Sequence, residues 1–465
     1  MQSDFFGGLG PQVDPHSLYQ SRRKDLIESI KNTEGYTHND NNLIVLWAAL
    51  EGGHERLRQD KSFYYYTGLN EPGVVLTLAM NGKSTLYIPH YFEKRSQWMV
   101  IQEALLQKDA KGLGLDAIEY LGKECSGYML YPFFSSHDYE YMIALLQNTV
   151  SAEGRIYTTS PQNGYEYIST RSVLCHLQQC IPGLQGAVSD ISSLIAMSRR
   201  HKDISEIEKI YRAIEVTELA HESAVQTVKH GALEAEIQAS LEYIMTAAHA
   251  RPAFPSIVAS GKNGTVLHYN ENKGALKDGE LVVIDIGAEL ENYCADLTRT
   301  YPVSGSFTKR QKELYTLVLE TQTYVAEQAK PGIWLKNPDK PDQSLHHLAY
   351  KFLEKRGYAK YFPHGIGHYL GLDVHDVGSY SEPLHEGDVI TIEPGIYIPE
   401  ESIGIRIEDN YWITKNGSVC LSENLPKEVE DIEMFMQQIA QGEDAQEGGD
   451  DNEYDEYDDE DDDYH

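Results

Sequence analysis

The sequence predicts a multi-domain α/β protein in which a smaller mixed α/β domain precedes a larger α+β domain. A length of 465 residues exceeds what one ordinary hydrophobic core serves. Hydrophobic residues make up 41% and charged residues 24% of the chain, as in globular proteins. Strand-like and helical segments alternate along it. We expect an N-terminal domain over residues 1–190, a second domain over 195–440 and a disordered acidic tail over 441–465.

The first domain contains segments of both types. Strands are expected at KSFYYYTGL (61–69), GVVLTLAM (73–80) and KSTLYIPH (83–90), around the turn signals NEPG and NG. Helices are expected at 21–30 and 141–150. No cluster of potential metal ligands stands out in this region.

Amphipathic helices dominate the start of the second domain. A helix is expected from Asp203, whose side chain can cap it with Glu206 as the capping-box partner, to Gly231. Further helices are expected at 233–248, 311–329 and 344–357, with strands over 256–305 and short strands up to 420.

Charge and composition exclude several function classes. The formal charge is −33, and the 14 acids after residue 440, where no Lys or Arg occurs, leave −19 on the rest. Such an acidic chain argues against nucleic acid as a partner. No apolar stretch reaches the roughly 20 residues that span a bilayer, so no membrane partner is expected. The N-terminus lacks the features of a secretory signal, and the five scattered cysteines read as reduced thiols, so we expect a cytoplasmic protein.

The acidic tail has two interpretations. A block of like charges is usually a disordered, solvating segment. The alternative is a docking segment for basic partners.

The run FPHGIGHYLGLDVHDVG (362–378) concentrates histidine, aspartate and glycine. His364 and His368 are four residues apart, as in the helical zinc motif H-E-x-x-H, but Gly365 stands where that motif needs Glu. The glycines also oppose a helix, since each costs about 1 kcal/mol relative to Ala. A glycine-rich loop or strand is therefore expected.

Acidic residues stand inside strongly apolar strand-like runs. Asp285 lies in LVVIDIG, Glu393 in VITIEPG and Glu408 in IGIRIED. A buried ionised carboxylate must be paired, protonated or metal-bound. A single one would usually be a salt-bridged structural acid, whereas three with few basic neighbours favour a shared cation. Asp296 follows Asp285 by eleven residues, so the turn GAELENY must intervene if both are to meet across paired strands.

Four carboxylates and one histidine suit Mn²⁺ or Co²⁺, with Zn²⁺ as a further alternative. Four negative charges and a bridging hydroxide favour two divalent ions, which is a known hydrolytic arrangement.

The ordered motifs DIGAELENYCADLTRT, HGIGHYLGLDVHD, ITIEPG and GIRIED resemble those of the pita-bread metallopeptidases, and within them aminopeptidase P, with prolidase as a close relative. The stretches SIVASGKNGTVLHYNEN and RLRQDKSFYYYTGLNEPGVVL are similar to the same proline-specific branch. The resemblance covers residues 20–435 and is most specific in the C-terminal half. It implies a C-terminal pita-bread catalytic domain and a homo-oligomer.

The resemblance also implies roles for single residues. The metal ligands would be Asp285, Asp296, His368, Glu393 and Glu408, with Asp296 and Glu408 bridging the two ions.

The resemblance also implies catalytic and substrate-binding roles for five residues. Glu393 would also handle the proton of the hydroxide, and His268 and His375 would be catalytic histidines. His364 would line the proline pocket with Arg406, the pocket arginine. Asp373 and Asp376 are expected to be turn residues or to orient a histidine.

The implied activity is hydrolysis of the N-terminal Xaa-Pro bond of peptides with proline in second position. An Xaa-Pro bond is a tertiary amide without N–H, so a pocket shaped for the ring gives specificity. Prolidase, which takes only dipeptides, is the nearest alternative. Methionine aminopeptidases lack the amino-terminal domain, and a creatinase-like activity does without the metals. A non-catalytic histone-binding role would explain the tail, but such homologues have lost ligands that this chain keeps.

Overall fold

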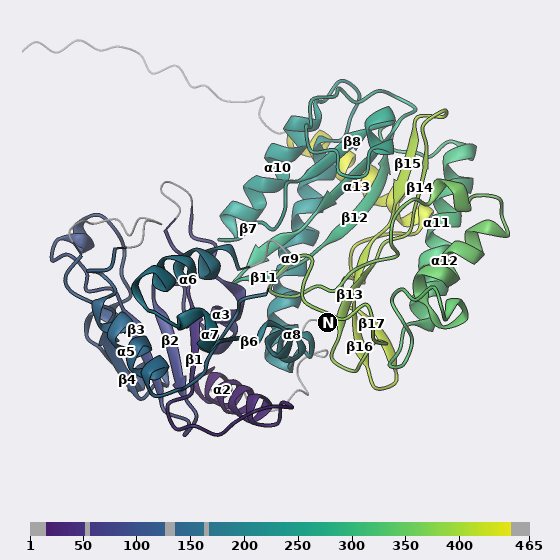
Figure 1. Ribbon diagram of the computed structural model, residues 1–465. Coiled ribbons are helices and arrows are strands. Elements are labelled where there is room, and N and C mark those ends of the chain that lie inside the picture. Colours follow the sequence, from purple (N-terminus) through teal and green to yellow (C-terminus); the bar gives the residue numbers. More distant parts are fainter. Residues whose placement is uncertain (1–14, 52–55, 126–134, 162–166, 448–465) are drawn as a thin grey trace, which may run out of the picture. The chain divides into compact units, whose positions relative to one another are not determined.

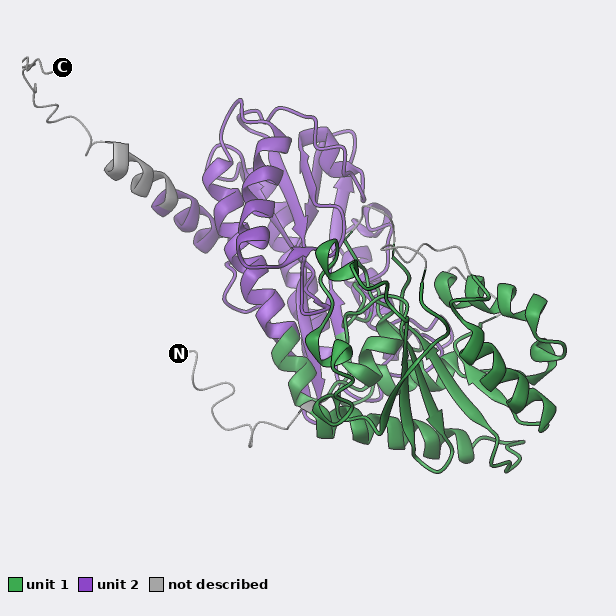
Figure 2. Cartoon of the chain, turned by 90° about the vertical axis from the view of Figure 1, so that its left-hand side faces the viewer, with its two compact units in different colours: residues 1–209, 369–379, 385–389 green, residues 210–368, 380–384, 390–465 purple. Residues whose placement is uncertain are grey.

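The computed structural model describes residues 15–51, 56–125, 135–161 and 167–447, with the side chains after 438 left out. The chain forms two compact units (Figure 2). Unit 1 comprises residues 1–209, 369–379 and 385–389, and unit 2 comprises 210–368, 380–384 and 390–465. Residues 441–447 of the tail, which were expected to be disordered, belong to helix α13 (Val429–Glu447), and the rest of the tail, residues 448–465, lies outside the described residues.

A six-stranded mixed sheet forms the centre of unit 1 (Figure 1), in the order β4-β3-β2-β1-β5-β6. The pairs β1–β2 and β2–β3 are antiparallel, and β3–β4, β1–β5 and β5–β6 are parallel. The strands are β1 (Leu43–Trp47), β2 (Val75–Ala79), β3 (Ser84–Ile88), β4 (Ala117–Tyr120), β5 (Ile156–Thr158) and β6 (Val188–Asp190). The helices are α2 (Pro15–Lys31), α3 (Lys61–Thr67), α4 (Glu103–Leu106), α5 (Glu140–Ser151), α6 (Ile168–Cys180), α7 (Leu184–Ala187) and α8 (Ser192–Arg200).

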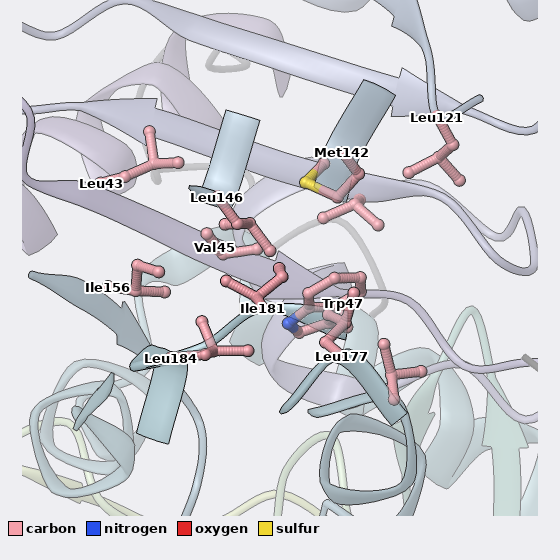
Figure 3. Close-up of a cluster of buried hydrophobic side chains, with 12 residues drawn as sticks. Leu43, Val45, Trp47, Leu121, Met142, Leu146, Ile156, Leu177, Ile181 and Leu184 are labelled. Carbon is pink, nitrogen blue, oxygen red and sulfur yellow. The ribbon is translucent and has the colours of Figure 1, made fainter. Parts of the chain in front are cut away.

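One face of this sheet packs against helices α5, α6 and α7 (Figure 3). Leu43, Val45 and Trp47 alternate along β1 and point to the same side, as the period of two in a strand requires. Met142 and Leu146 of α5 meet them there, together with Leu177, Ile181 and Leu184. These side chains form the hydrophobic core that makes the unit compact.

The strand predicted at KSFYYYTGL is wrong, because these residues form helix α3. The Asp60 side chain accepts a hydrogen bond from the backbone N–H of Phe63 at 2.8 Å and caps the helix, and Gly68 ends it with φ +71°. All three tyrosines and Phe63 are buried. Caps and burial on several sides therefore outweigh the β-propensity of the aromatic residues.

Unit 2 is built from short strands and long helices. Its sheets have the orders β12-β9-β8, β13-β16-β17, β11-β10-β7 and β14-β15. The strands are β7 (Arg251–Pro252), β8 (Ile257–Ser260), β9 (Leu281–Ile286), β10 (Ala288–Leu290), β11 (Tyr293–Cys294), β12 (Leu297–Pro302), β13 (Val389–Ile392), β14 (Gly395–Ile398), β15 (Ile403–Arg406), β16 (Asp409–Thr414) and β17 (Gly417–Cys420). The long helices are α9 (Ile204–Thr227), which begins in unit 1, α10 (Glu234–Ala247), α11 (Lys309–Gln328) and α12 (Leu345–Glu354). In Figure 1, α11 and α12 lie side by side next to the β14–β15 pair. None of the helices in the described ranges combines the length and apolarity that crossing a membrane requires.

The predicted capping box of α9 is confirmed. The backbone N–H of Glu206 donates to Asp203 Oδ1 at 3.1 Å, and that of Asp203 donates to Glu206 Oε2 at 3.2 Å. The helix ends at Thr227, a few residues before Gly231.

The predicted turn between Asp285 and Asp296 is confirmed as a hairpin excursion. Strands β9 and β12 pair antiparallel with Asp285 opposite Thr298, and β10 and β11 form a small hairpin between them. Glu291 and Asn292 turn this hairpin with φ values of +50° and +69°. Because this hairpin separates β9 from β12, the odd number of residues between the two acids does not force them onto opposite faces of one strand.

Buried ion pairs explain why two short C-terminal segments belong to unit 1. Arg200, at the end of α8, donates from Nε and Nη2 to the two carboxylate oxygens of Asp388, each at 2.8 Å. Its neighbour Arg199 binds Asp376 at 2.6 Å, and Lys202 binds the same carboxylate at 2.9 Å. All these side chains are nearly inaccessible to solvent.

We expect Asp388→Asn to destabilise unit 1 by about 3–5 kcal/mol, because it removes the negative charge that faces the buried guanidinium of Arg200. The measurement is the shift of the urea midpoint and of Tm. The control is Asp342→Asn, which removes the partner of the exposed Lys351 and should change neither value appreciably. Equal shifts in the two variants would contradict the account of the buried pair.

Candidate metal centre

Three of the predicted ligands converge in unit 2. One ligand atom from each of Asp296, His368 and Glu408 can be chosen so that all lie within 4.8 Å of one another. His368 Nε2 is 3.3 Å from Asp296 Oδ2. Asp296 precedes β12, His368 belongs to the glycine-rich run and Glu408 lies between β15 and β16, so residues far apart in sequence form one cluster.

The other two predicted ligands join this cluster. His368 Nε2 is 3.6 Å from Glu393 Oε1. Burial first, and then the negative charges of the nearby Asp285 and Glu393, raise the pKa of Asp296. The structure thus brings together all five residues that the sequence singles out.

Backbone pairing places the ligands. The backbones of Thr298 and Glu408 form an isolated antiparallel β-bridge, in which the N–H of Glu408 donates to the Thr298 carbonyl at 3.1 Å. Arg299 stabilises this β-bridge, since its Nη1 donates to the carbonyls of Thr298 and Glu408 and its Nη2 donates to Asp409. The buried Arg299–Asp409 pair therefore joins the strand after Asp296 to the strand after Glu408.

The histidine run is a loop, as predicted, and it pairs with β13. The N–H of Thr391 donates to the His368 carbonyl, and that of Glu393 donates to the Ile366 carbonyl, each at 2.9 Å. A Cβ on Gly367 would lie 2.0 Å from the Thr391 carbonyl oxygen, so glycine is required for this approach. The Thr391 hydroxyl in turn donates to Glu393 and accepts from the N–H of His368.

Burial and mutual repulsion disfavour the ionised acids. Burial is the largest cause that raises the pKa of Asp296 and of Glu408 well above the usual values, and the neighbouring carboxylates add to it. Burial also raises the pKa of Glu393, although His368 and Arg406 oppose the shift. The site is therefore short of positive charge.

Arg406 supplies one cation and connects several groups. Its Nη2 donates to Asp285 Oδ2 at 2.6 Å, its Nε to the Thr298 hydroxyl at 3.1 Å and its Nη1 to the Tyr397 hydroxyl at 2.8 Å. The Thr298 hydroxyl then donates to Glu408 Oε2 at 2.7 Å. One buried guanidinium thus orients two of the acids.

The residues present fit divalent cations. Asp285 Oδ1 is buried and accepts no hydrogen bond from any of the described residues. In the described part of the chain, Arg406 is the only Lys or Arg in ion-pair contact with the four acids, and it pairs only with Asp285. A carboxylate oxygen without a donor, in a cluster of acids and one imidazole, has the chemistry of a ligand set for hard or borderline cations.

His364 lies at the edge of the cluster. Burial, with the charge of Arg406, lowers its pKa to about 3, so its imidazole is neutral at neutral pH. Nδ1 lies 2.8 Å from the Gly365 carbonyl and therefore carries the proton, while Nε2 accepts from the Tyr397 hydroxyl at 3.0 Å. His268 is exposed and close enough for its charge to contribute to the shift of His364.

His375 is an exposed residue of unit 1, apart from the unit that contains the five clustered side chains. Asp373 and Asp376 beside it form ion pairs with basic side chains: Arg199 Nη2 donates to both, and Lys202 donates to Asp376. Their partners are thus the basic residues of and after α8.

Sequence reasoning missed Thr298, Thr391 and Tyr397. Each is a neutral residue whose hydroxyl bonds to a clustered acid, to Arg406 or to His364. Two of them stand two residues from a predicted ligand, Thr298 after Asp296 and Thr391 before Glu393. That spacing puts them on the same face of a strand and is the one signal that could have found them.

We expect Glu408→Gln to weaken divalent metal binding at least ~100-fold, because it removes a buried carboxylate that faces Asp296 and His368. The measurement is the metal retained after incubation with MnCl₂ and gel filtration, with calorimetric titration for the affinity. Glu400→Gln is the control, since this exposed acid lies in the turn between β14 and β15. A Glu408→Gln protein with full metal content would rule out the cluster as the binding site.

Comparisons with known proteins agree with this geometry. The family described as "Metallopeptidase family M24" matches residues 208–415, and "Aminopeptidase P, N-terminal domain" matches residues 19–123. The chain is 32% identical to the Xaa-Pro aminopeptidase of Haemophilus influenzae, over 85% of this chain and 93% of that protein. It is 31% identical to human Xaa-Pro aminopeptidase 3, over 94% and 91%. An Xaa-Pro dipeptidase of Pyrococcus horikoshii is 42% identical over 50% of this chain and 65% of that protein.

Solved structures show the same fold. Escherichia coli aminopeptidase P with the inhibitor Pro-Leu superimposes with a TM-score of 0.75 at 27% identity, covering 93% of this chain and 100% of that one. The zinc-substituted form of the same protein with product gives 0.74, covering 92% and 99%. An N-terminal mixed α/β domain and a C-terminal pita-bread domain are therefore established, and the chain belongs to metallopeptidase family M24, to its aminopeptidase P group.

Proposed function

We propose that this metallo-aminopeptidase removes the N-terminal residue of peptides whose second residue is proline. The observation that carries the proposal is the convergence of four carboxylates, three of them buried, with His368 and, among the described residues, one pairing arginine. Relatives named Xaa-Pro aminopeptidase, aligned over nearly the whole chain, support the substrate class.

The ligand set we propose is Asp285, Asp296, His368, Glu393 and Glu408, which together would hold two divalent cations. The oxygen-rich donor set favours Mn²⁺, with Co²⁺ or Zn²⁺ as alternatives. When bound, two divalent cations would supply a water that is deprotonated at neutral pH and would polarise the scissile carbonyl.

The protein's own groups position the substrate and move protons. Glu393 is the most exposed of the four clustered carboxylate side chains, at 18%, and the Thr391 hydroxyl orients it, so we assign it the proton of the attacking water. His268 and His375 are assigned as hydrogen-bond donors to the substrate. The proline nitrogen must receive a proton before it leaves, and Glu393 is the group that holds one.

Proline recognition is assigned to the surroundings of His364. Its neutral imidazole makes edge-to-face contacts with the rings of Phe362 and Tyr397, at centroid distances of 5.0 and 5.4 Å. A neutral aromatic wall suits an apolar pyrrolidine ring and needs no substrate N–H, which a bond to proline lacks. Arg406 acts here through the Tyr397 hydroxyl, which it holds at 2.8 Å.

A dipeptidase is the second candidate, because the dipeptidase of Pyrococcus horikoshii has the higher identity, although over half of the chain. The match of residues 19–123 to the N-terminal domain of aminopeptidase P favours the first. A non-catalytic histone-binding role is disfavoured because all five ligand positions are filled and clustered. The cytoplasmic location and the homo-oligomeric state stay predictions.

We expect manganese-loaded protein to cleave both Xaa-Pro dipeptides and Xaa-Pro peptides of three or more residues. The measurement is release of the first amino acid, followed by liquid chromatography with peptides of two to six residues. Cleavage of dipeptides alone would favour prolidase. No cleavage of any length would refute both candidates.

A companion variant ties the activity to the cluster. Asp296→Asn should lower kcat/KM at least ~100-fold, since the ligand set loses a charge at its centre. Asp278→Asn is the matched control, because this acid is exposed and pairs only with His230 in the described structure. Unchanged turnover in Asp296→Asn would sink the assignment.

A further inference from the structure

His268 lies in a segment without regular strand pairing, residues 261–274, between β8 and β9. Its side chain is exposed and, within the described residues, forms no hydrogen bond or ion pair of its own. A catalytic imidazole must be held close to its working position, since a misplacement of 1 Å can cost about 100-fold in rate. The position of His268 therefore depends on what fixes the segment around it.

The carboxylate of Glu234, in the first turn of α10, binds this segment on both sides of His268. Its Oε1 accepts from the N–H of Ser260 at 2.7 Å, from the Ser260 hydroxyl at 2.8 Å and from Asn263 Nδ2 at 2.9 Å. Its Oε2 accepts from the Tyr269 hydroxyl at 2.9 Å and from the N–H of Gly274 at 2.6 Å. Five donors from four residues thus meet on one buried carboxylate.

Tyr269, the neighbour of His268 in the chain, is itself hydrogen-bonded to Glu234 and so links His268 to this carboxylate through one peptide bond. Its hydroxyl accepts from the N–H of Lys273 at 3.2 Å and donates to Glu234. A Cβ on Gly274 would lie 2.7 Å from Glu234 Oε1, so only glycine lets the backbone reach the carboxylate here.

A second clamp on α10 supports the first. Asn272, with φ +48°, donates to Gln238 Oε1 and to the Ser256 carbonyl, and accepts from the N–H of Val258. The segment is thus fastened to one helix and one strand, while His268 itself extends to solvent.

Glu234 is an unusual buried acid. It is fully buried, and no Lys or Arg pairs with it among the described residues. Burial raises its pKa, but the hydrogen bonds from Asn263, Ser260 and Gly274 outweigh this, and the net pKa lies below the ordinary value. The carboxylate charge is therefore stabilised by the donors of Ser260, Asn263, Tyr269 and Gly274.

We propose that Glu234 is a positioning residue for the reaction, which fixes segment 261–274 and through it places His268 against the substrate. This inference rests on the proposed function, because it takes His268 as a catalytic group. Glu234 touches neither the substrate nor the clustered acids.

The test is a double-mutant cycle of Glu234→Gln and His268→Ala in the full-length, manganese-loaded protein, with an Xaa-Pro tripeptide. An amide keeps the side chain's size but replaces one acceptor oxygen by a donor group, so at least one backbone N–H loses its partner. We expect Glu234→Gln alone to lower kcat roughly 10- to 100-fold with metal content unchanged. In the His268→Ala background the further loss should be less than about twofold, because the two residues act as one unit.

Two companion variants keep the test decisive. Glu236→Gln removes a carboxylate in the same helical turn as Glu234. This carboxylate accepts from the N–H of Leu233 and not from segment 261–274, so kcat should be unchanged. Tyr269→Phe removes one of the five hydrogen bonds and should give a smaller loss with the same non-additivity. It replaces Glu234→Gln if that variant has a greatly lowered Tm.

Hydrogen exchange followed by mass spectrometry gives a readout independent of turnover. In Glu234→Gln the amides of residues 260–274 should exchange faster, and in Glu236→Gln they should not. Unchanged exchange, full activity of Glu234→Gln, or a loss that multiplies with that of His268→Ala would each overturn the proposal. Wild-type protein without turnover, or fully active His268→Ala, would instead refute the proposed function, while exchange would still decide whether Glu234 anchors the segment.

Discussion

Mutual repulsion among four clustered carboxylates, three of them buried, is the constraint on which the rest of the catalytic unit depends. Asp285, Asp296, Glu393 and Glu408 come from four separate segments, yet burial and their neighbours raise the pKa of three of them. Because these like charges repel one another, the surrounding fold must hold the four carboxylates together. Here the pairing of β9 with β12, the bridge from Thr298 to Glu408 and the buried Arg299–Asp409 pair do so.

Neutral hydroxyls and one guanidinium distribute the charge of the site. Arg406 bonds to Asp285, Thr298 and Tyr397, and these contacts extend to Glu408 on one side and to His364 on the other. A change at His364 is thereby connected to the orientation of two of the clustered acids, Asp285 and Glu408. Networks of this kind rigidify a site only when every member is satisfied. Among the described residues, the buried oxygen Oδ1 of Asp285 is the member of this network without a hydrogen-bond donor.

Much of the fold and site could be predicted because the signals were local or came as ordered motifs. The long helices followed from apolar periodicity, and the capping box of Asp203 and Glu206 followed from residue type and spacing. The acids in apolar runs followed from the cost of burying charge. Helix α3 could not be predicted, because its aromatic residues favour strands and only their burial and the Asp60 cap decide otherwise. Thr298 and Thr391 had only their two-residue spacing from a predicted ligand as a signal, and Tyr397 and Glu234 had none, because the partners of a hydroxyl or a helix-borne acid are known only in the folded chain.

The sequence by itself determined which side chains are able to hold cations and that a turn must separate Asp285 from Asp296, since residue chemistry and strand periodicity are local properties. Only the tertiary structure decided which donors meet which acids. The segment 385–389 belongs with α8 because Asp388 finds Arg200, 188 residues away, and the segment around His268 is fixed by Glu234, which precedes it by more than thirty positions. The physical reason is that hydrogen bonds and ion pairs depend on distance and direction in space, which spacing along the chain encodes only within one helix turn or one strand pair.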